Sequence, residues 1–342
     1  MIIIKPEYYK SFQCIAGDCP DSCCQGWEVD ADADSLAYYE TLDASLPIKK
    51  RIDSVLDRDE FGNIIFALAR HKRCPFLNDE NLCDMHIAIG GEHTPYTCRT
   101  FPRFIYDFGG TREIGISFSC PVAAELIYNH KSHLLFEQEA NGDLPTLNDI
   151  DALTYIKLSK ARNEAYKIAQ NDALTIRQRL LSLLDFAVEL QTELDEMKPF
   201  EETQSIISDN KLYIPKYKEA DENISFFEVF NNPELINEQW QEKIKNPNLK
   251  AIENKIYNEQ IIMYFIYKYF LQAVYDYDVL SKVKMAAVGV LINTYFGEDS
   301  WTMHLWSKET EHSQYNMDRY KNLLLKAKCL RADALKKRLE EM

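Results

Sequence analysis

The hydrophobic positions in the second half of the chain follow a helical period. In the range 172–197, apolar side chains recur three and four residues apart, at Leu180, Leu184 and Ala187 among others, which predicts an amphipathic helix. Helices with the same kind of spacing are predicted over 148–170, near Phe226, and over 250–276, 281–295 and 318–341. The range 199–221 is polar and is predicted to be a loop. This part of the chain is therefore expected to be mainly α-helical.

The first third of the chain has a different pattern, in which turn residues are frequent. Eight of the 11 glycines lie before residue 116, and this composition predicts loops. The range 104–120 contains two β-prone runs on either side of Gly109-Gly110, which predicts a β-hairpin. Pro121 suits the first turn of a helix, which is predicted to continue to about Glu139.

A cluster of helix-breaking residues over 141–145 separates these two parts of the chain. We place the domain boundary there, with a metal-binding module at residues 1–140 and a helical domain at residues 141–342. The expected fold class is mainly α, with a loop-rich cysteine module that carries a small β-hairpin and packs on a helical body.

The composition is that of a globular protein with a hydrophobic core, since 46% of the residues are hydrophobic and 27% are charged. A net charge of −15 argues against a nucleic-acid partner, because phosphate binding needs clustered Lys and Arg. The same charge suits a basic partner. The N-terminus lacks the apolar region of a signal peptide, and charged residues interrupt the apolar range 261–296, so no membrane span is predicted. We expect a cytoplasmic protein.

Cysteine is concentrated in the first 120 residues, which contain eight of the nine cysteines. They are Cys14, Cys19, Cys23, Cys24, Cys74, Cys83, Cys98 and Cys120. In a reducing cytoplasm, such a dense set indicates metal binding or catalysis rather than disulfides. Cysteines that served only as small core residues would have no reason to crowd in this way. All eight are therefore candidate metal ligands.

The first four of these cysteines lie in one short segment, interleaved with Gly, Pro and Asp. A loop of this kind can direct several thiolates to one metal centre, whereas a single regular helix or strand would not. The vicinal pair Cys23-Cys24 either supplies one ligand and one packing residue, or serves a multi-metal cluster. Cys19, Cys74 and Cys120 directly precede proline, as in loops that bind iron–sulfur clusters.

Zinc and an iron–sulfur cluster are the two alternatives for the metal. His86 follows Cys83 by three residues and His71 precedes Cys74 by three, so either histidine could complete a mixed zinc site. Single histidines are more often ordinary surface or core residues. Eight thiols with little histidine favour an iron–sulfur cluster, most simply a 4Fe–4S cluster, because thiolates are its usual ligands. Spacing by itself does not decide between them.

Taken in order, these motifs resemble the flagellin lysine-N-methylase (FliB) family, within a wider group that has cysteine-rich zinc- or iron-chelating segments. The motifs are Cys14-x4-Cys19-x3-Cys23-Cys24-x-Gly26-Trp27, Cys74-Pro-Phe-Leu, Leu-Cys83-x2-His86, Cys98-Arg-x-Phe-Pro-Arg103 and Ser-Cys120-Pro121. The resemblance implies N-methylation of lysine side chains on flagellin or another lysine-bearing protein. It also implies S-adenosylmethionine as the methyl donor and an iron–sulfur cluster as cofactor.

Two familiar donor-binding patterns are missing from the sequence. A Rossmann-type methyltransferase binds its donor at a glycine-rich turn between a strand and a helix, and residues 143–288 contain no glycine. The radical signature Cys-x3-Cys-x2-Cys also fails, because Gly26 stands where the third cysteine would follow Cys19 and Cys23. Any donor site is therefore expected to be of an unfamiliar kind.

Four further residues are candidates for methyl transfer. Glu311 and His312 are either a catalytic general-base pair or part of a solvated polar face. Arg99 and Arg103 either bind the donor carboxylate or an anionic cluster, or make ordinary surface ion pairs. The aromatic series over 257–270 is more typical of a core than of a substrate cage. We predict a protein-lysine N-methyltransferase; the alternatives are a non-enzymatic metal-binding module for redox sensing or scaffolding, and an electron-transfer enzyme.

Overall fold

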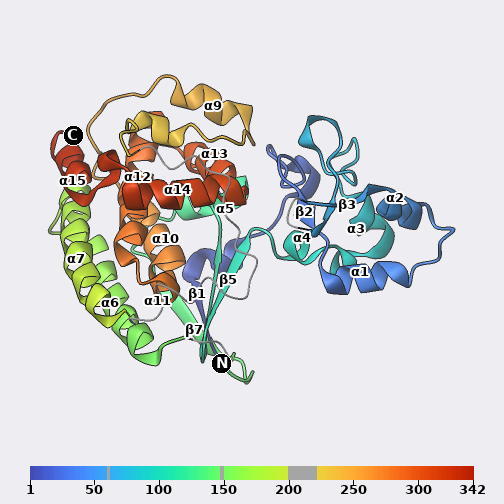
Figure 1. The fold of residues 1–342 in the computed structure, drawn as a ribbon, viewed down its shortest axis with the longest axis horizontal. Coiled ribbons are helices and arrows are strands. Elements are labelled where there is room, and N and C mark those ends of the chain that lie inside the picture. The colour runs from blue at the N-terminus through green and yellow to red at the C-terminus, as the bar shows by residue number, and fades with distance from the viewer. Residues whose placement is uncertain (60–61, 147–149, 199–221) are drawn as a thin grey trace.

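The structure is a computed structural model that describes residues 1–59, 62–146, 150–198 and 222–342. It has a mainly α-helical fold, as predicted. Figure 1 shows a smaller lobe, formed by the elements from β2 to α4, beside a larger lobe that contains the longer helices and a sheet. The N-terminal strand belongs to the larger lobe, so the chain enters the smaller lobe and then returns.

The smaller lobe consists of short elements joined by turns. They are β2 (Val29–Asp30), α1 (Ala33–Glu40), α2 (Pro47–Val55), β3 (Leu56–Arg58), β4 (Ile64–Phe66), α3 (Asp84–Ile89) and α4 (Tyr96–Thr100). The three strands form a sheet in the order β2-β4-β3. Local signals start the first helices, because the Asp32 carboxylate accepts a hydrogen bond from the Ser35 amide and Pro47 occupies the first turn of α2.

A four-stranded sheet in the larger lobe contains the predicted hairpin. Its strands are β1 (Ile2–Pro6), β5 (Arg103–Phe108), β6 (Thr111–Ile116) and β7 (Phe136–Ala140), in the order β5-β6-β1-β7. Strands β5 and β6 are antiparallel, which confirms the hairpin. Strand β1 lies parallel to β6 and antiparallel to β7. Gly109 has a φ of 62° in the connecting turn, a conformation that glycine adopts without strain.

The prediction of a helix from Pro121 to about Glu139 is wrong at its C-terminal end. Helix α5 (Pro121–Tyr128) ends early, and residues 136–140 form β7. Five residues of β7 pair with residues of β1 that lie 130 to 138 positions earlier in the sequence. Strand pairing of this kind depends on a distant partner, so it overrides local helix propensity and is invisible in a local pattern.

The helical body is formed by the remaining helices. They are α6 (Ala152–Ala169), α7 (Ile176–Met197), α9 (Glu238–Ile244), α10 (Ile256–Tyr269), α11 (Ala273–Asp276), α12 (Val279–Phe296), α13 (Ser300–Glu311), α14 (Gln314–Lys326) and α15 (Ala332–Glu340). The helix predicted over 318–341 is two helices, α14 and α15. Near Phe226 there is only a short 3-10 turn at Phe227–Phe230. The loop predicted over 199–221 lies outside the described residues.

Helix α13 was not predicted, and burial explains why. Residues 302–310 of this helix are all buried, including Ser307, Lys308 and Glu309. A helix that is buried on all sides lacks the alternation of apolar and polar faces from which helices are recognised. The polar residues of α13 are buried because they contact other parts of the chain, as described below.

Helix α12 lies in the centre of the larger lobe. Of the helices in the described part of the chain, it is the one whose length and composition would suit a membrane span, and 94% of that window is buried inside the protein. Its lysines find internal partners: Lys282 pairs with Asp276, and the Lys284 ammonium group donates to the Leu324 carbonyl. The apolar composition is therefore that of a central core helix.

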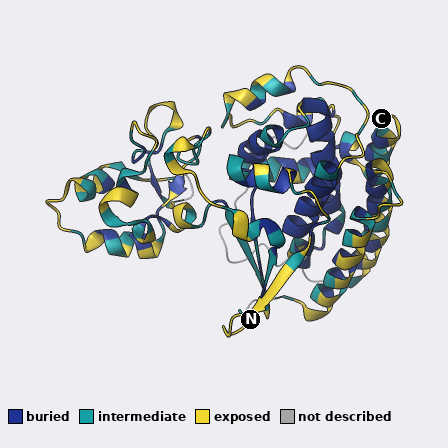
Figure 2. Cartoon of the chain, turned by 180° about the vertical axis from the view of Figure 1, so that it is seen from behind, coloured by how far each residue is buried: buried dark blue, intermediate teal, exposed yellow. Residues whose placement is uncertain are grey.

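The buried side chains form two hydrophobic clusters. One lies within residues 29–85 and includes Phe66, Phe76 and Met85. The other lies in the larger lobe and includes residues from both sides of position 140. Figure 2 shows the same contrast, with most buried residues in the larger lobe. The boundary between residues 140 and 141 stays a prediction.

Candidate metal centre

All nine cysteines are free thiols, and Cys24, Cys74, Cys83 and Cys98 belong to the smaller lobe. The segments that carry the first two run side by side. The Cys74 amide donates to the Cys24 carbonyl at 2.8 Å, and the adjacent residues Gln25 and Arg73 form an antiparallel bridge. These backbone contacts bring together two cysteines that are 50 positions apart in sequence.

Cys83 and Cys98 approach the same region from two short helices. Leu77 forms a bridge with Cys83, which closes the turn that begins at Cys74. Cys83 is the N-cap of α3, where its sulfur accepts a hydrogen bond from the His86 amide at 3.4 Å. Burial raises the pKa of Cys83, although the hydrogen bond from the His86 amide favours the thiolate. Cys98 lies on α4, and the residue as a whole is exposed to solvent.

These four thiols influence one another electrostatically. Burial raises the pKa of Cys74 to about 12, with contributions from Cys24 and Cys83. Desolvation and the thiols of Cys24, Cys74 and Cys83 raise the pKa of Cys98. Thiolates that crowd together repel one another, so the deprotonated set needs a cation to be stable. A metal ion supplies that charge and displaces the protons when it binds.

A second group of cysteines lies where the two lobes meet. Cys120 is the N-cap of α5 and belongs to the core of the larger lobe. Cys14, Cys19 and Cys23 come from the loop between β1 and β2. Burial raises the pKa of Cys120 to about 11, and the thiols of Cys19 and Cys14 also raise it. The N-terminal loop and the start of α5 therefore converge.

Asp21 holds this loop against helix α13. Its carboxylate accepts hydrogen bonds from His304 Nε2 at 2.9 Å and Lys308 Nζ at 2.5 Å. The other ring nitrogen of His304 lies 3.3 Å from the Phe118 carbonyl, two residues before Cys120. Because the side chains of His304 and Lys308 are 0% and 3% exposed, their contacts with Asp21 are buried and fix the loop in place.

The vicinal pair Cys23-Cys24 lies between the two groups. A hydrogen bond between the two thiols lowers the pKa of Cys24 to about 7 and raises that of Cys23. Lys308 also favours the Cys24 thiolate. The Trp27 indole N–H donates to the Cys23 carbonyl at 2.7 Å, which fixes the backbone at this point.

The spacing of the thiols bears on which metal group they fit. In a tetrahedral zinc site with Zn–S bonds of about 2.3 Å, the sulfur atoms lie about 3.8 Å apart. Across the described residues, ligand atoms from three side chains lie within 4.8 Å of one another only at His133, Asp172 and Glu259. No three of the described thiols come that close together. Thiolates are the usual ligands of an iron–sulfur cluster, and the choice between zinc and a cluster stays a prediction.

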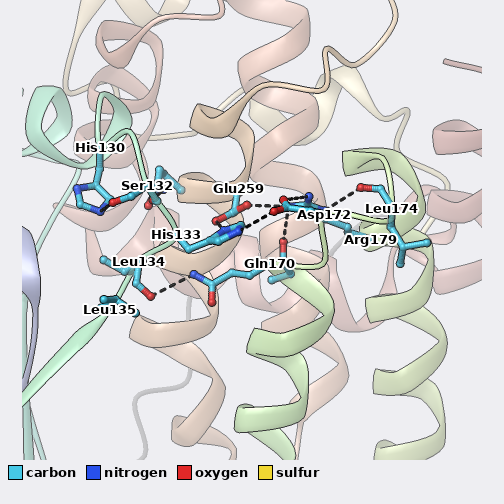
Figure 3. Close-up of polar contacts among 12 residues, drawn as sticks. His130, Ser132, His133, Leu134, Leu135, Gln170, Asp172, Leu174, Arg179 and Glu259 are labelled. Carbon is cyan, nitrogen blue, oxygen red and sulfur yellow. Dashed lines mark hydrogen bonds and ion pairs between the residues drawn. The ribbon is translucent and has the colours of Figure 1, made fainter.

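The trio of His133, Asp172 and Glu259 is shown in Figure 3. His133 lies between the two carboxylates, with Nδ1 2.7 Å from Glu259 and Nε2 3.1 Å from Asp172. The hydrogen bond to Glu259, together with that to Asp172, raises the pKa of His133. Arg179 pairs with both carboxylates. A protonated His133 and Arg179 balance the two negative charges, so we interpret this cluster as an ion-pair network.

Glu311, a predicted catalytic residue, lies in a buried polar cluster. Its carboxylate accepts hydrogen bonds from Lys268 at 2.5 Å, Tyr269 at 2.6 Å and Ser117 at 2.8 Å. Burial opposes its ionisation, but the Lys268 charge and the hydrogen bonds prevail and lower the pKa of Glu311. Its side chain is 7% exposed, so the solvated-face alternative is wrong for Glu311.

Lys268, which was not singled out in the sequence, has an aromatic environment. Its ammonium nitrogen lies 5.2 Å from the ring centres of Phe104 and Tyr269, and 5.4 Å from that of Tyr264. Cation–π contacts and the Glu311 carboxylate together compensate a charge whose side chain is 8% exposed. Part of the aromatic series over 257–270 therefore surrounds a buried cation instead of forming only apolar core.

His312 follows Glu311 but faces different neighbours. Its ring lies against Trp27, with centroids 4.6 Å apart, and meets the edge of Phe101 at 5.3 Å. Burial lowers the pKa of His312 to about 3, so the ring is neutral at pH 7 and is a weak base. Its Nδ1 is buried without a hydrogen-bond partner. The general-base pair stays a prediction, and this geometry does not favour it.

The two candidate arginines have structural contacts. Arg99 donates to the carbonyls of Glu92 and Thr94, and Arg103 donates to the Tyr9 hydroxyl at 3.0 Å. Neither arginine is joined to Glu311 or His312 by the contacts described. Phe101, which lies between the two arginines in sequence, is the residue that reaches His312. Binding of a donor by Arg99 and Arg103 stays a prediction.

Sequence reasoning missed Asp21, His304, Lys308 and Lys268. Asp21 lies between cysteines in the first motif, where it was treated as a turn residue. Asp299 was an available signal for α13, because its carboxylate accepts a hydrogen bond from the Thr302 amide and caps the helix. Recognition of α13 would have placed His304, Lys308 and Glu311 on one helix.

Comparisons with known proteins give distant similarities. No protein-family model and no solved structure matches the chain. Over 131 residues, the chain is 25% identical to the flagellar biosynthetic protein FliU of Salmonella muenchen, a stretch that is 37% of this chain and 77% of FliU. Over 131 residues, it is 24% identical to lysine-N-methylases of Salmonella typhimurium and Salmonella choleraesuis, and this covers 32% of their length. The matched stretch is thus about a third of each lysine-N-methylase.

Proposed function

We propose that this chain is a cytoplasmic, metal-dependent protein-lysine N-methyltransferase. It transfers methyl groups from S-adenosylmethionine to lysine ε-amines of flagellin or a similar protein, and it carries an iron–sulfur cluster. The similarity to lysine-N-methylases supports the activity. The match covers about a third of those proteins, so substrate and donor are part of the proposal.

The observation that carries this proposal is the environment of Lys268. A carboxylate and three aromatic rings surround an ammonium group. A site that methylates lysine needs groups of these kinds, because the substrate amine must be held and aligned with the donor methyl group. Glu311 is the proposed orienting carboxylate, and in the substrate-free chain Lys268 occupies the place of the substrate amine.

The location of Glu311 also connects it with the cysteines. Helix α13 carries Glu311 at its C-terminal end and Lys308 one turn earlier, and Lys308 contacts Asp21 in the cysteine loop. An iron–sulfur cluster held by the cysteines would supply electron transfer or a metal-centred ligand site. The residues of α13 would hold the cysteine loop and the amine-binding groups in a constant relation.

The negative charge of the chain favours a lysine-bearing substrate. A net charge of −15 attracts a basic protein surface and speeds the encounter of the two proteins at low salt. The charge does not identify the substrate lysine, which depends on local contacts. Methylation at high ionic strength should therefore be slower, with an unchanged pattern of modified sites.

The test is methylation of purified flagellin by anaerobically purified protein with isotope-labelled S-adenosylmethionine. Intact-mass and peptide mass spectrometry should show additions of whole methyl groups on lysines. Glu311→Gln should lower the rate at least tenfold, whereas Cys329→Ser, a thiol outside the cysteine-rich region, should leave it unchanged. Unmodified flagellin in the presence of metal-loaded, folded protein would overturn the proposal.

The second candidate is a non-enzymatic metal-binding module for redox sensing or scaffolding. It is favoured by the partial coverage of the methylases, since the chain spans about a third of their length. A protein that binds flagellin and metal with no methyl transfer would be assigned to this class.

A further inference from the structure

We propose that the eight N-terminal cysteines form two iron–sulfur sites instead of one. The lobe set is Cys24, Cys74, Cys83 and Cys98. The junction set is Cys14, Cys19, Cys23 and Cys120. The inference rests on the metal binding proposed above, but it does not depend on methyl transfer.

The backbone of the smaller lobe assembles the lobe set without help from the larger lobe. The hydrogen bond from Cys74 to Cys24 and the bridge between Leu77 and Cys83 join three separate segments. Cys74 belongs to the hydrophobic cluster of this lobe, and Cys24 and Cys83 pack against that cluster. Helix α4, which carries Cys98, is tied to the same lobe because the Tyr96 amide donates to the Asp32 carboxylate at 2.6 Å.

The junction set depends on the larger lobe. Cys120 belongs to the hydrophobic cluster of the larger lobe and not to that of the smaller one. The loop with Cys19 and Cys23 is held there by the chain of contacts from Asp21 through His304 to the Phe118 carbonyl. The Cys19 thiol also lies 3.3 Å from the Asp21 carbonyl. Asp21 therefore positions the loop cysteines beside Cys120.

Cys14 and Cys23 are assigned by their place in the chain. Cys14 lies in the same loop between β1 and β2 as Cys19, and Cys23 lies two residues after Asp21, which holds that loop against His304. We assign Cys23 to the junction set because the lobe set already has four thiols. The vicinal pair would then place the two sites next to each other.

Ligand number supports two sites as well. Four cysteine thiolates are the usual complete set for a 4Fe–4S cluster. With one cluster, four of the eight crowded thiols would have no metal to bind. Two sets of four would give every one of these thiols a metal.

The first test is the iron content of the anaerobically purified wild-type protein, which needs no variant. Two clusters require about eight irons and about eight sulfides per chain, and one cluster requires about four of each. Electron paramagnetic resonance of the reduced protein should show two centres that broaden each other's signals. A content of about four irons with the spectrum of one isolated centre would overturn the proposal.

The second test compares Cys74→Ser with Cys120→Ser. The two residues are matched, because each thiol is buried and precedes proline. Each variant should keep about half of the iron and the spectrum of one centre, and the double variant should keep none. Cys329→Ser should keep all of it. Loss of all iron in either single variant, with a circular dichroism spectrum like that of wild type, would show one shared site.

The outcomes separate this inference from the proposed function. A protein with eight irons that does not methylate flagellin would disprove the activity and keep the two sites. A protein with four irons that methylates flagellin would disprove the two sites and keep the proposed activity.

Discussion

The two lobes of this protein are stabilised by different means. Among the described residues, nine buried residues form the cluster of the smaller lobe, and 58 form that of the larger lobe. The helices of the smaller lobe have five to nine residues, whereas α7 has 22. A unit with so small a core is marginally stable unless a metal or a cross-link stabilises it. The comparison predicts that the smaller lobe depends on the proposed metal for its stability, whereas the larger lobe does not.

The junction between the lobes differs from both interiors. Charged and aromatic side chains make the contacts, with Asp21 bound to His304 and Lys308 and the Trp27 ring packed at an angle against His312. Contacts of this kind have preferred geometry, whereas apolar contacts do not. The junction is therefore suited to hold the cysteine loop in one orientation on α13.

The largest expected effect is that of metal removal on the smaller lobe. Chelation of the metal, or Cys74→Ser, should lower the free energy of unfolding of the smaller lobe by several kcal/mol, since binding of a structural metal contributes on the order of 10 kcal/mol to folding. Limited proteolysis and hydrogen exchange should show loss of protection within residues 29–100, with α10 and α12 still protected. Equal loss of protection in both lobes would contradict the comparison.

The next effect concerns the larger lobe. Lys268→Met removes one partner of a buried ion pair and leaves the Glu311 carboxylate without its counter-charge. The free energy of unfolding should fall by about 3–5 kcal/mol, measured by denaturant unfolding with a probe in the larger lobe. Lys282→Met is the matched control, because the carboxylate of its partner Asp276 is half exposed and the change should be much smaller. Similar losses in the two variants would show that burial of the pair is not what matters.

A smaller effect is expected when the lobes are uncoupled. Asp21→Asn removes the negative charge between His304 and Lys308, and it should lower the free energy of unfolding by about 2 kcal/mol. Hydrogen exchange should increase in the cysteine loop and in α13, and much less in α7. Asp18→Asn, in the exposed part of the same loop, should change neither.

The contribution of Asp21 should also depend on pH. The hydrogen bond from His304 and the charge of Lys308 outweigh burial and lower the pKa of Asp21. The stabilisation is therefore present above the ordinary aspartate pKa of about 3.9 and is lost as the pH falls below it. If wild type and Asp21→Asn differed equally at pH values of about 3 and about 7, the carboxylate charge would not be responsible.

The smallest effect is expected at His133, on the surface of the larger lobe. His133→Gln should lower the free energy of unfolding by less than about 1 kcal/mol, because the His133 ring is partly exposed. The pKa of His133 is raised, so its contribution is complete below the unfolded pKa of about 6.5 and is lost as the pH rises through the higher folded value. The difference between wild type and variant in thermal unfolding should be larger at pH about 6 than at pH about 8.5. A constant difference would exclude a role for the protonated ring.

The local pattern of the sequence predicted the elements that depend on neighbouring residues. Helices α6, α7 and α12 and the hairpin of β5 and β6 were all expected within a few residues of their observed bounds. The single helix predicted over 250–276 is α10, a short 3-10 turn and α11. Strand β7 was missed because its partner β1 is far away in sequence. Helix α13 was missed because it is buried on all sides.

The sequence by itself determined that thiols are crowded, that the chain is acidic and that most of it is helical, since these follow from composition and local periodicity. Only the tertiary structure decided which cysteines lie together. Cys74 and Cys24 are neighbours through backbone pairing of distant segments, and His304 joins the loop of Cys19 to the chain just before Cys120. The tertiary structure also decided the surroundings of Glu311, whose partners Lys268, Tyr269 and Ser117 come from other elements. Spacing along a chain carries no information about such contacts, since loops of any sequence length can bring two side chains to the same place.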